Sequence, residues 1–393
     1  MLPLLLRRLR PRQLRALPQR RYAGSAWAVR TVDLRSDTVT RPSPAMRAAM
    51  AAAQVGYDIF EEDPTVNELQ RRAAELFGME ETLFVPSGTM ANLISVMCHC
   101  PERGAELIVG DQAHIHLCEQ GGVAQIAGIH SRVVKNLPDG TFDLNEVESK
   151  IRHSSGTHCP RTSVICLENT QNFTGGRVPP LSFLQEARAL ADRYGLPIHM
   201  DGARLMNAAI ALDVKASEIL RLCDSVSVCL NKGLGSPIGC LIGGRKEFIN
   251  QAIRVRRVLG GLMRQAGVLA AAGLISLSDM VERLRDDHRN TRKFAQGVQA
   301  FSSSICDIDI NAVETNIIMF PVNDPRISAK EFCDKMAEVT EEEVTAMGCG
   351  VQVLLHHMYD CKVRAVWHLD VSEEDTDLAL WKLQYVIEKV NQK

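Results

Sequence analysis

Between residues 82 and 242 the chain alternates short apolar runs rich in β-branched residues with segments whose apolar positions recur at helical spacing. This alternation is typical of a parallel β-sheet covered by helices. The pattern predicts seven strands: Thr82–Val85, Leu107–Val109, Ser131–Val134, Ser163–Leu167, Pro197–Met200, Ser225–Leu230 and Cys240–Gly243. We therefore expect an α/β fold with a mostly parallel central sheet.

Start and stop signals mark several helices around these strands. They predict helices over Ala45–Ala53, Thr65–Leu76 and Phe183–Tyr194. The first follows Ser43-Pro44, a capping residue and a proline suited to the first turn. Thr65 and Glu68 have the spacing of a capping box at the start of the second. Gly195 follows the third helix and is a residue type that often ends one.

After the last predicted strand the pattern changes to long helices. The two expected helices are Val268–Asp286 and Thr291–Phe301. A mixture of helical and strand patterns follows from about Asp307. We predict a large domain over residues 32–270, with an N-terminal segment, and a smaller C-terminal α+β domain over residues 271–393.

The first 32 residues differ in charge from the rest of the chain. They hold eight arginines and no acidic residue, so with a formal net charge of −2 overall the remainder carries −10. An acidic body argues against nucleic acid or an anionic membrane as the main partner. With 46% hydrophobic and 23% charged residues a globular chain is expected. No later stretch has the run of about 18 apolar residues that spans a bilayer.

An arginine-rich, acid-free and amphipathic N-terminus is typical of a mitochondrial transit peptide. We predict that residues 1–22 are such a peptide, that disorder extends to about residue 30, and that the protein is located in the mitochondrial matrix. A basic tail that binds another molecule is the alternative. The twelve cysteines are scattered singly, and Cys98-His99-Cys100 lacks the spacing of a zinc site, so we expect reduced thiols and no metal.

Polar residues follow four of the predicted strands, at the edge where open parallel sheets bind ligands. After Thr82–Val85 the turn Ser87-Gly88-Thr89 precedes an apolar helix, so its amides and hydroxyls could hold a phosphate. A simple helix cap is the alternative. After Leu107–Val109, His114 offers an imidazole to the same edge, with a purely structural role as the alternative.

Two further turns supply an acid and an amine. Asp201 follows a strand that we expect to be buried on both faces, and Arg204 lies three residues later. A local ion pair between them is the alternative to a ligand site. Lys232 follows another apolar strand and precedes Gly233, where partial burial favours the neutral amine that acts as a nucleophile. A lysine at the surface is the alternative.

The order of these turns is the one expected for pyridoxal phosphate (PLP) on a fold of the aspartate aminotransferase type. Lys232 would hold the cofactor as a Schiff base, and the Ser87-Gly88-Thr89 turn would hold its phosphate. Asp201 would keep the pyridine nitrogen protonated, and His114 could stack on the ring. The sequence therefore predicts a PLP enzyme whose catalytic residues are Lys232, His114 and Asp201.

These turns belong to a wider set of motifs, and over residues 32–370 the chain resembles the low-specificity L-threonine aldolase family of fold-type-I PLP enzymes. The motifs that carry the resemblance are Asp33-Leu34-Arg35-Ser36-Asp37-Thr38-Val39-Thr40, Glu62-Asp63-Pro64-Thr65-Val66, Ser87-Gly88-Thr89, Glu119-Gln120-Gly121-Gly122, His199-Met200-Asp201-Gly202-Ala203-Arg204, Lys232-Gly233-Leu234-Gly235, Met263-Arg264-Gln265 and Arg364 with His368.

The resemblance implies an activity and further site residues. Members of the family cleave threonine by a retro-aldol reaction into glycine and acetaldehyde, and we expect the same here for L-threonine and L-allo-threonine. Ser36, Arg204 and Arg364 would bind the substrate carboxylate, with Arg204 beside the cofactor as well. Arg256 would reach the phosphate of a neighbouring subunit. We therefore expect a homodimer or homotetramer with the active site at the subunit interface.

Several positions depart from the family pattern. Gln171 stands where many members have a histidine. Because an amide cannot take up a proton near neutral pH, Gln171 at the substrate is expected to slow bond cleavage. Phe60, Asn231, Leu262 and Trp367 also differ from the pattern. Two other functions stay open, a PLP lyase for another β-hydroxy amino acid or amine and a catalytically silent relative.

Overall fold

The computed structural model describes residues 20–21, 28–152, 157–301, 305–358 and 361–392. It divides into two compact units, one formed by Thr40–Arg285 and the other by the chain up to Val39 together with Asp286–Lys393. The predicted transit peptide, residues 1–22, lies outside the described residues except for Arg20 and Arg21, which form the short strand β1 (Arg20–Arg21). Among the described residues, no helix is both long and apolar enough to cross a membrane.

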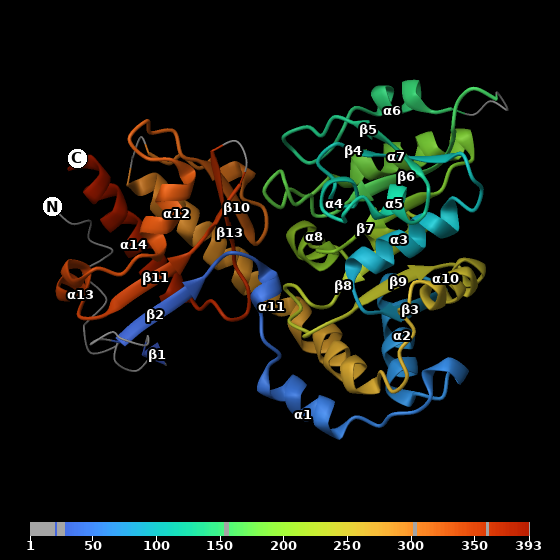
Figure 1. The fold of residues 1–393 in the computed structure, drawn as a ribbon, viewed down its shortest axis with the longest axis horizontal. Helices are drawn as coiled ribbons and strands as arrows, with labels where there is room; N and C mark the ends of the chain where they lie inside the picture. The colour runs from blue at the N-terminus through green and yellow to red at the C-terminus, as the bar shows by residue number, and fades with distance from the viewer. Residues whose placement is uncertain (1–19, 22–27, 153–156, 302–304, 359–360, 393) are drawn as a thin grey trace. The chain divides into compact units, whose positions relative to one another are not determined.

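The unit Thr40–Arg285 contains the predicted sheet, whose strand order is β3-β9-β8-β7-β6-β4-β5 (Figure 1). The strands are β3 (Glu81–Val85), β4 (Ala105–Gly110), β5 (His130–Val134), β6 (Arg161–Glu168), β7 (Ile198–Asp201), β8 (Ser225–Cys229) and β9 (Cys240–Gly244). All seven predicted strands are confirmed. Neighbours from β8 to β5 pair in parallel, whereas β9 runs antiparallel to both β8 and β3. The predicted α/β fold with a mostly parallel sheet is therefore confirmed.

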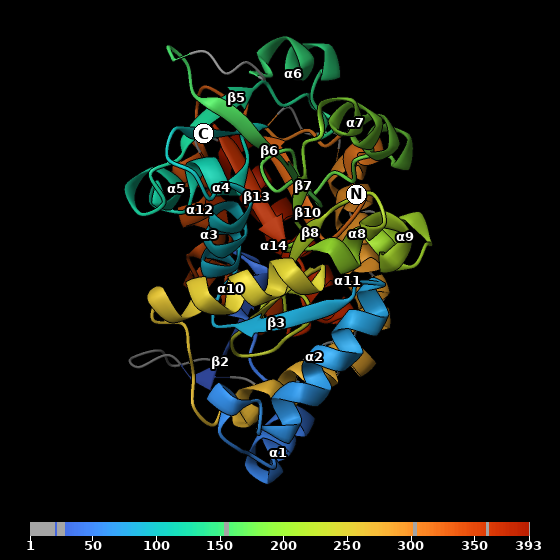
Figure 2. The same ribbon diagram turned by 90° about the vertical axis from the view of Figure 1, so that its right-hand side faces the viewer.

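The same unit contains helices, several of which cover the sheet. They are α1 (Pro44–Ala52), α2 (Pro64–Phe77), α3 (Gly88–His99), α4 (His114–Leu117), α5 (Gly122–Gln125), α6 (Leu144–Lys150), α7 (Leu181–Tyr194), α8 (Leu205–Leu212), α9 (Ala216–Leu220) and α10 (Lys246–Val258). The helices α3 and α10 pack against each other (Figure 2), and both pack against β3 and β9. Every residue of β4, β8 and β9 is buried, because both faces of the sheet are covered.

The helix starts follow the sequence signals at α1 and differ at α2. The Ser43 hydroxyl accepts from the Met46 amide at α1, as the sequence predicts. At α2 the predicted capping box of Thr65 and Glu68 is wrong, since the capping side chain is Asp63. A proline directly after Asp63 fits the first helical position, and this sets the cap one residue before it.

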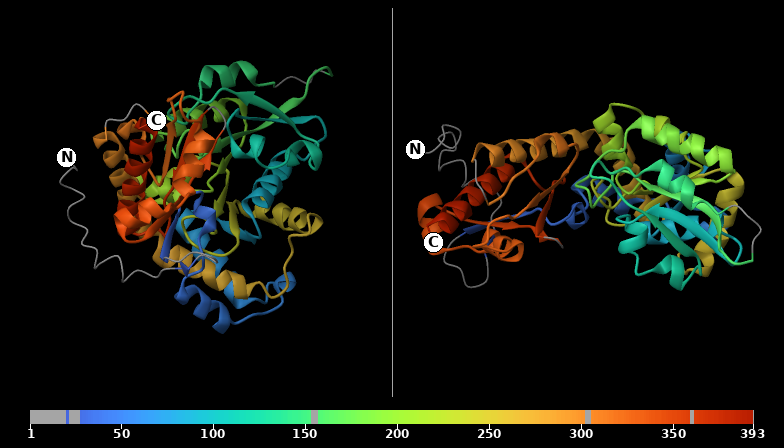
Figure 3. Two further views of the ribbon diagram at one scale, coloured as in Figure 1. Left: turned by 60° about the vertical axis from the view of Figure 1, so that its left-hand side comes forward. Right: turned by 90° about the horizontal axis from the view of Figure 1, so that it is seen from above.

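The second unit holds two small sheets. Its elements are β2 (Ala28–Asp33), β10 (Ile317–Pro321), α12 (Ala329–Ala337), α13 (Glu341–Met347), β11 (Gly350–Leu354), β12 (His356–His357), β13 (Lys362–Val366) and α14 (Glu373–Asn391). The strand β2 pairs in parallel with β11 despite their distance in the sequence (Figure 1). The helices α12 and α14 pack against β11 and against each other (Figure 3).

The division between the units differs from the predicted one near residue 270. One continuous helix, α11 (Gly267–Ala300), replaces the two predicted helices, and the division falls inside it after Arg285. Asp287 and Asn290, which fall between the two predicted helices, are buried on the inner face of the continuous helix. The segment before Val39 joins the C-terminal unit because β2 pairs there.

Candidate active site

Four of the predicted site residues in the unit Thr40–Arg285 lie at one edge of the seven-stranded sheet. Ser87 follows β3, His114 follows β4, Asp201 ends β7, and Lys232 follows β8. The strand β3 has the same direction as β8 because both are antiparallel to β9. All four side chains therefore come from the carboxyl ends of strands, which is where open sheets of this kind bind ligands.

Asp201 is a buried acid whose partners are neutral. Its side chain is 2% exposed, and its Oδ2 accepts a hydrogen bond from Asn92 Nδ2 at 2.9 Å. Its Oδ1 accepts from the Ala203 amide at 3.1 Å. Two neutral donors orient the carboxylate without neutralising it, which suits an acid that has to meet a cationic group of a ligand.

His114 is held by a second buried acid, Glu119. His114 Nδ1 lies 2.9 Å from Glu119 Oε1, and the same oxygen accepts from Asn92 Nδ2 at 2.8 Å. The hydrogen bond to Glu119 raises the pKa of His114, while burial and the nearby charge of Lys232 act in the opposite direction. Burial raises the pKa of Glu119. The imidazole is thus fixed in one orientation at the edge of the sheet, half exposed to the space above it.

Glu168, the last residue of β6, is a third acid at this edge that sequence reasoning missed. Its Oε2 accepts from the His114 amide at 2.7 Å and its Oε1 from the Asn172 amide at 2.8 Å. Burial, with the charge of Asp201, raises the pKa of Glu168 to about 7. Its position at the end of a buried strand, the same as that of Asp201, is a signal that could have found it.

The turn Ser87-Gly88-Thr89 caps a helix, and its binding of a phosphate stays a prediction. Ser87 caps α3 by accepting from the Met90 amide at 3.2 Å. The next amides, those of Gly88 and Thr89, have no partner within the helix, as at every helix start, and are oriented to bind an anion. A Cβ atom at Gly88 would lie 2.7 Å from Cys229 Sγ, so only glycine allows this turn to pack against β8.

Lys232 lies half buried in the turn after β8. Its carbonyl oxygen accepts from the Gly235 amide at 2.8 Å, and Gly235 has a φ of 76°. Among the described residues, none forms a hydrogen bond or ion pair with the ammonium group of Lys232. A half-buried amine without a partner, beside a buried acid and a row of helix amides, fits a carbonyl cofactor that carries a phosphate.

Arg204 is 7% exposed and begins α8. Its Nη1 donates to Asn172 Oδ1 at 3.4 Å, and Asn172 is itself bound to Glu168. In the other unit, Arg364 on β13 donates to the Arg35 carbonyl at 3.1 Å, next to Ser36 in the chain. The structure thus brings Ser36 close to Arg364, as two of the predicted carboxylate ligands.

The structure shows the surroundings of two positions that depart from the family pattern. Gln171 is 1% exposed, with Nε2 donating to the Gln112 carbonyl at 2.9 Å and Oε1 accepting from the Thr174 amide at 2.7 Å. Both halves of its amide are bonded to backbone, so the predicted contact of Gln171 with substrate is not supported. Trp367 is fully buried and packs against Phe294, with ring centroids 5.0 Å apart, in the core of the C-terminal unit.

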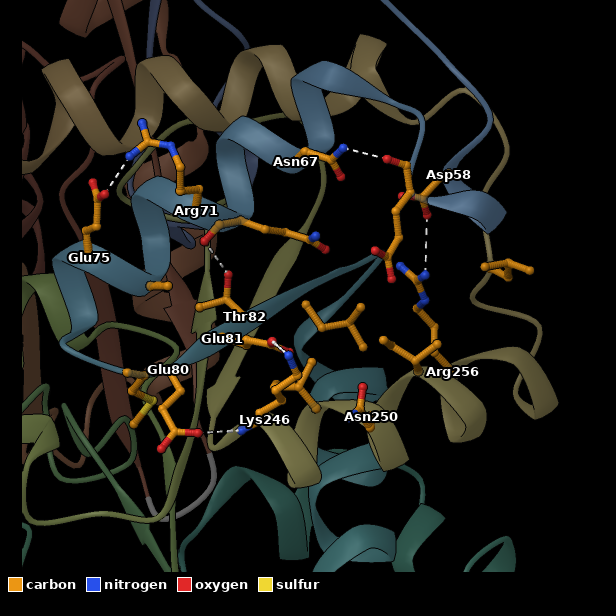
Figure 4. Close-up of a pocket in the computed structure, with 18 of the residues that line it drawn as sticks. Asp58, Asn67, Arg71, Glu75, Glu80, Glu81, Thr82, Lys246, Asn250 and Arg256 are labelled. Carbon is orange, nitrogen blue, oxygen red and sulfur yellow. Dashed lines mark hydrogen bonds and ion pairs between the residues drawn. The ribbon is translucent and has the colours of Figure 1, made fainter.

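Arg256 has partners within its own chain. It is 3% exposed, with Nη1 donating to the Phe84 carbonyl at 2.9 Å and Nη2 lying 3.3 Å from Asp58 Oδ2. The pair lines a cavity of about 690 Å³ between α2, β3 and α10, to which Arg71 and Lys246 also contribute (Figure 4). Contact of Arg256 with a neighbouring subunit's phosphate stays a prediction.

One group of described residues has the geometry of a possible metal site. His114, Glu119 and Asp201 each offer a ligand atom, and these atoms lie within 4.8 Å of one another. Asn92 already donates to both carboxylates, and Glu119 is also hydrogen-bonded to His114 Nδ1. We interpret this group as a hydrogen-bonded network, because its acceptors are satisfied by protein donors.

An open, mostly parallel sheet with a lysine, an acid and a histidine at its carboxyl edge defines an α/β enzyme with its ligand site at that edge. The chain belongs to the beta-eliminating lyase family, whose model matches residues 33–325. The probable low-specificity L-threonine aldolase 2 of Arabidopsis thaliana is 46% identical over 331 residues, which cover 84% of this chain and 93% of that protein. This match confirms the resemblance that the motifs indicated.

Solved structures share the fold at low sequence identity. The threonine aldolase of Leishmania major superposes with a TM-score of 0.73 and 18% identity, covering 90% of this chain and 99% of that chain. A structure of SPT with PLP superposes with a TM-score of 0.68 and 16% identity, covering 92% of this chain and 88% of that chain.

Proposed function

We propose that this protein is a PLP-dependent carbon–carbon lyase that cleaves L-threonine and L-allo-threonine into glycine and acetaldehyde. The observation that carries the proposal is the pair of neighbouring strand ends at β7 and β8. There, among the residues that the structure describes, the donors to the buried Asp201 are neutral and the amine of Lys232 has no partner. The similarity to the Arabidopsis protein, a probable low-specificity L-threonine aldolase, supports threonine as the substrate.

The residues of this edge fit PLP. Lys232 would attach the cofactor, the amides of Gly88 and Thr89 would bind its phosphate, and Asp201 would face its ring nitrogen. When bound, PLP supplies an electron sink for the carbanion that remains after the Cα–Cβ bond breaks. Arg204, oriented by Asn172, would bind the substrate carboxylate through two parallel hydrogen bonds. Such a contact fixes which bond of the substrate is cleaved.

The test combines an activity assay with identification of the lysine that binds PLP. The full chain, loaded with PLP, is incubated with L-threonine and with L-allo-threonine, and glycine and acetaldehyde are measured. Borohydride reduction followed by peptide mapping should place the pyridoxyl group on Lys232. Lys232→Ala should remain folded and lose cleavage, whereas Lys330→Ala, whose side chain is 66% exposed on α12, should keep it. A label on another lysine, or cleavage retained by Lys232→Ala, would contradict the proposal.

We also propose a homodimer or homotetramer with the active site at the subunit interface. Phe60 and Val258 are 70% and 81% exposed, and each lies within two residues of the pair of Asp58 and Arg256 at the cavity in Figure 4. Large exposed apolar side chains of this kind often mark a protein interface. The double variant Phe60→Ser and Val258→Ser should sediment as a smaller species, while Leu137→Ser should not. An unchanged sedimentation coefficient would argue against this surface.

For the N-terminus we propose import into the mitochondrial matrix. The support is the chemistry of residues 1–22, which contain seven arginines and no acid. A fluorescent protein fused behind residues 1–22 should be located in mitochondria, and replacing the arginines by glutamine should leave it in the cytosol. A cytosolic location of the unaltered fusion would contradict the proposal.

A further inference from the structure

Asn92, on the buried side of α3, forms four side-chain hydrogen bonds. Its Nδ2 donates to Asp201 Oδ2 at 2.9 Å and to Glu119 Oε1 at 2.8 Å. Its Oδ1 accepts from Ser227 Oγ at 2.7 Å and lies 3.1 Å from His199 Nε2. Two donors and two acceptor positions are the full capacity of a primary amide, so Asn92 is completely satisfied at 1% exposure.

These bonds fix the orientation of the amide. A carboxylate only accepts hydrogen bonds, so the amide nitrogen has to face Asp201 and Glu119. The amide oxygen then faces Ser227 and His199, which means that His199 carries its proton on Nε2. Burial lowers the pKa of His199 to about 3, so its ring is neutral and Nδ1 is an acceptor.

The same reasoning extends the chain of hydrogen bonds away from the site. Ser225 Oγ lies 2.8 Å from His199 Nδ1 and 2.7 Å from His99 Nε2. Since the bare Nδ1 of His199 accepts, Ser225 donates to it and accepts from His99, whose pKa burial lowers to about 4. One donor from each of His99, Ser225, His199 and Asn92 therefore lies along a path of hydrogen bonds that ends at Asp201. Aligned dipoles of this kind stabilise a negative charge at the end of the chain.

We propose that Asn92 is a positioning residue for the cofactor site. Its one amide holds Asp201 and the pair of Glu119 and His114 in a single arrangement, and it ends a directed chain of neutral donors that stabilises the charge of Asp201. The inference rests on the proposed function, because it assigns Asp201 and His114 to the cofactor ring. Asn92 is the described residue that joins the two, since its Nδ2 bonds to both buried acids.

The decisive variant is Asn92→Asp, which keeps the size of the side chain and replaces the donor by an oxygen that faces two carboxylates. At pH 8 we expect PLP to bind about 10–100-fold more weakly, by analogy with the loss seen when hydrogen-bond partners of metal ligands are removed. With PLP at saturation, kcat for L-threonine should fall similarly and KM should change less, because the Asn92 amide is buried and bonds to Asp201 and Glu119. Ser95→Ala is the matched control, since Ser95 is equally buried on α3 and its hydroxyl donates to the Ala91 carbonyl of the same helix.

A pH profile separates positioning from a loss of packing. Protonation of the carboxylate that Asn92→Asp introduces restores one donor, so PLP affinity relative to wild type should recover as the pH falls from 8 to about 5.5. Asn92→Ala, which has no group to protonate, should show no such recovery. The titratable groups that face position 92 are Glu119, Asp201 and His199, and Asn92→Ala measured at each pH shows how PLP affinity responds to them when no carboxylate is introduced.

The inference would be overturned if Asn92→Asp bound PLP as tightly as Ser95→Ala does. It would also be overturned if Asn92→Ala recovered PLP affinity at low pH to the same extent as Asn92→Asp. If the position 92 variants do not fold, Ser227→Ala decides, because it removes one donor to the Asn92 oxygen and leaves both acids bound. We expect it to weaken PLP binding about threefold to tenfold, and binding equal to wild type would overturn the inference. A wild-type protein that neither binds PLP nor cleaves threonine would refute the proposed function instead, and this is seen before any variant is made.

Discussion

Single side chains at the sheet edge have roles that depend on what each one bonds. Gln171 ties its own loop to the turn before His114, with Nε2 on the Gln112 carbonyl and Oε1 on the Thr174 amide. Glu168 receives the amide of His114 from the same turn. Both side chains thus hold the backbone around the site and do not offer free groups to a substrate.

The loop role of Gln171 can be tested by substitution. Gln171→His should give no gain in threonine cleavage, because the ring takes a buried place between two backbone groups and not one beside the substrate. Gln171→Ala should lower the free energy of unfolding by about 1–3 kcal/mol, since a buried carbonyl and amide lose their partners. Urea unfolding measures this loss, with the exposed Gln125→Ala as control. A marked gain of activity in Gln171→His would restore the prediction of a missing base.

The pKa of Glu168 gives a pH dependence with a definite sign. It is raised from 4.5 to about 7, so the folded protein binds this proton more tightly than the unfolded chain does. The resulting stabilisation is complete below pH 4.5 and is lost as the pH rises through about 7. Between about pH 5 and pH 8 the unfolding free energy of wild type should therefore fall relative to Glu168→Gln, by at most about 3 kcal/mol. The control is the exposed Glu102→Gln, whose unfolding free energy should follow that of wild type at every pH. The same parallel course for Glu168→Gln and wild type would contradict the prediction.

At the scale of elements, one acid organises three segments of the chain. Asp63 Oδ1 accepts from the amides of Thr65 and Val66 at the start of α2. Its Oδ2 accepts from the amides of Gly56, at 3.2 Å, and Gly267, at 2.9 Å. The cap of α2 is thus also the anchor of the preceding loop and of the start of α11.

Removal of this anchor should cost more than the loss of an ordinary cap. A single cap contributes about 0.5–2 kcal/mol, and Asp143→Ala, which loses one such bond at α6, should fall in that range. Asp63→Ala leaves four amides without their acceptor, so we expect a loss of at least about 2 kcal/mol in urea unfolding. Equal losses in the two variants would show that the bonds from Gly56 and Gly267 contribute nothing.

At the scale of the whole molecule, the chain before Val39 is part of the C-terminal unit. The strand β2 pairs with β11, and Arg30 on β2 forms two hydrogen bonds of 2.7 Å with Asp375 at the start of α14. Asp375 also closes the capping box of α14 with Ser372. Residues that are 345 positions apart therefore share one small core.

This arrangement predicts which unit a substitution in β2 destabilises. Arg30→Ala should destabilise the C-terminal unit by about 1.5–3 kcal/mol, because Asp375 is 1% exposed and loses a charged partner. Hydrogen exchange should become faster in α14 and β11 while the seven-stranded sheet keeps its protection. The control is Thr31→Ala, because Thr31 is the exposed residue that follows Arg30 on β2. Faster exchange confined to residues 40–285 would contradict this division of the molecule.

The sequence by itself determined the seven strands, the mostly parallel sheet and the polar turns of Ser87, His114, Asp201 and Lys232. It could do so because hydrophobic periodicity is local, and because the carboxyl ends of parallel strands meet at one edge whatever the packing above them. The same local signals failed at α2 and α11, where a buried acid and a buried polar stretch decided the helix ends.

Only the tertiary structure decided which side chains meet at that edge. Asn92 lies 109 positions from Asp201 and comes from the interior of a helix, and Gln171 bonds to a carbonyl 59 positions away. The pairing of β2 with β11 and the buried place of Trp367 are of the same kind. Contacts between distant parts of the chain leave no periodic trace in the sequence, because each is set by how whole elements pack.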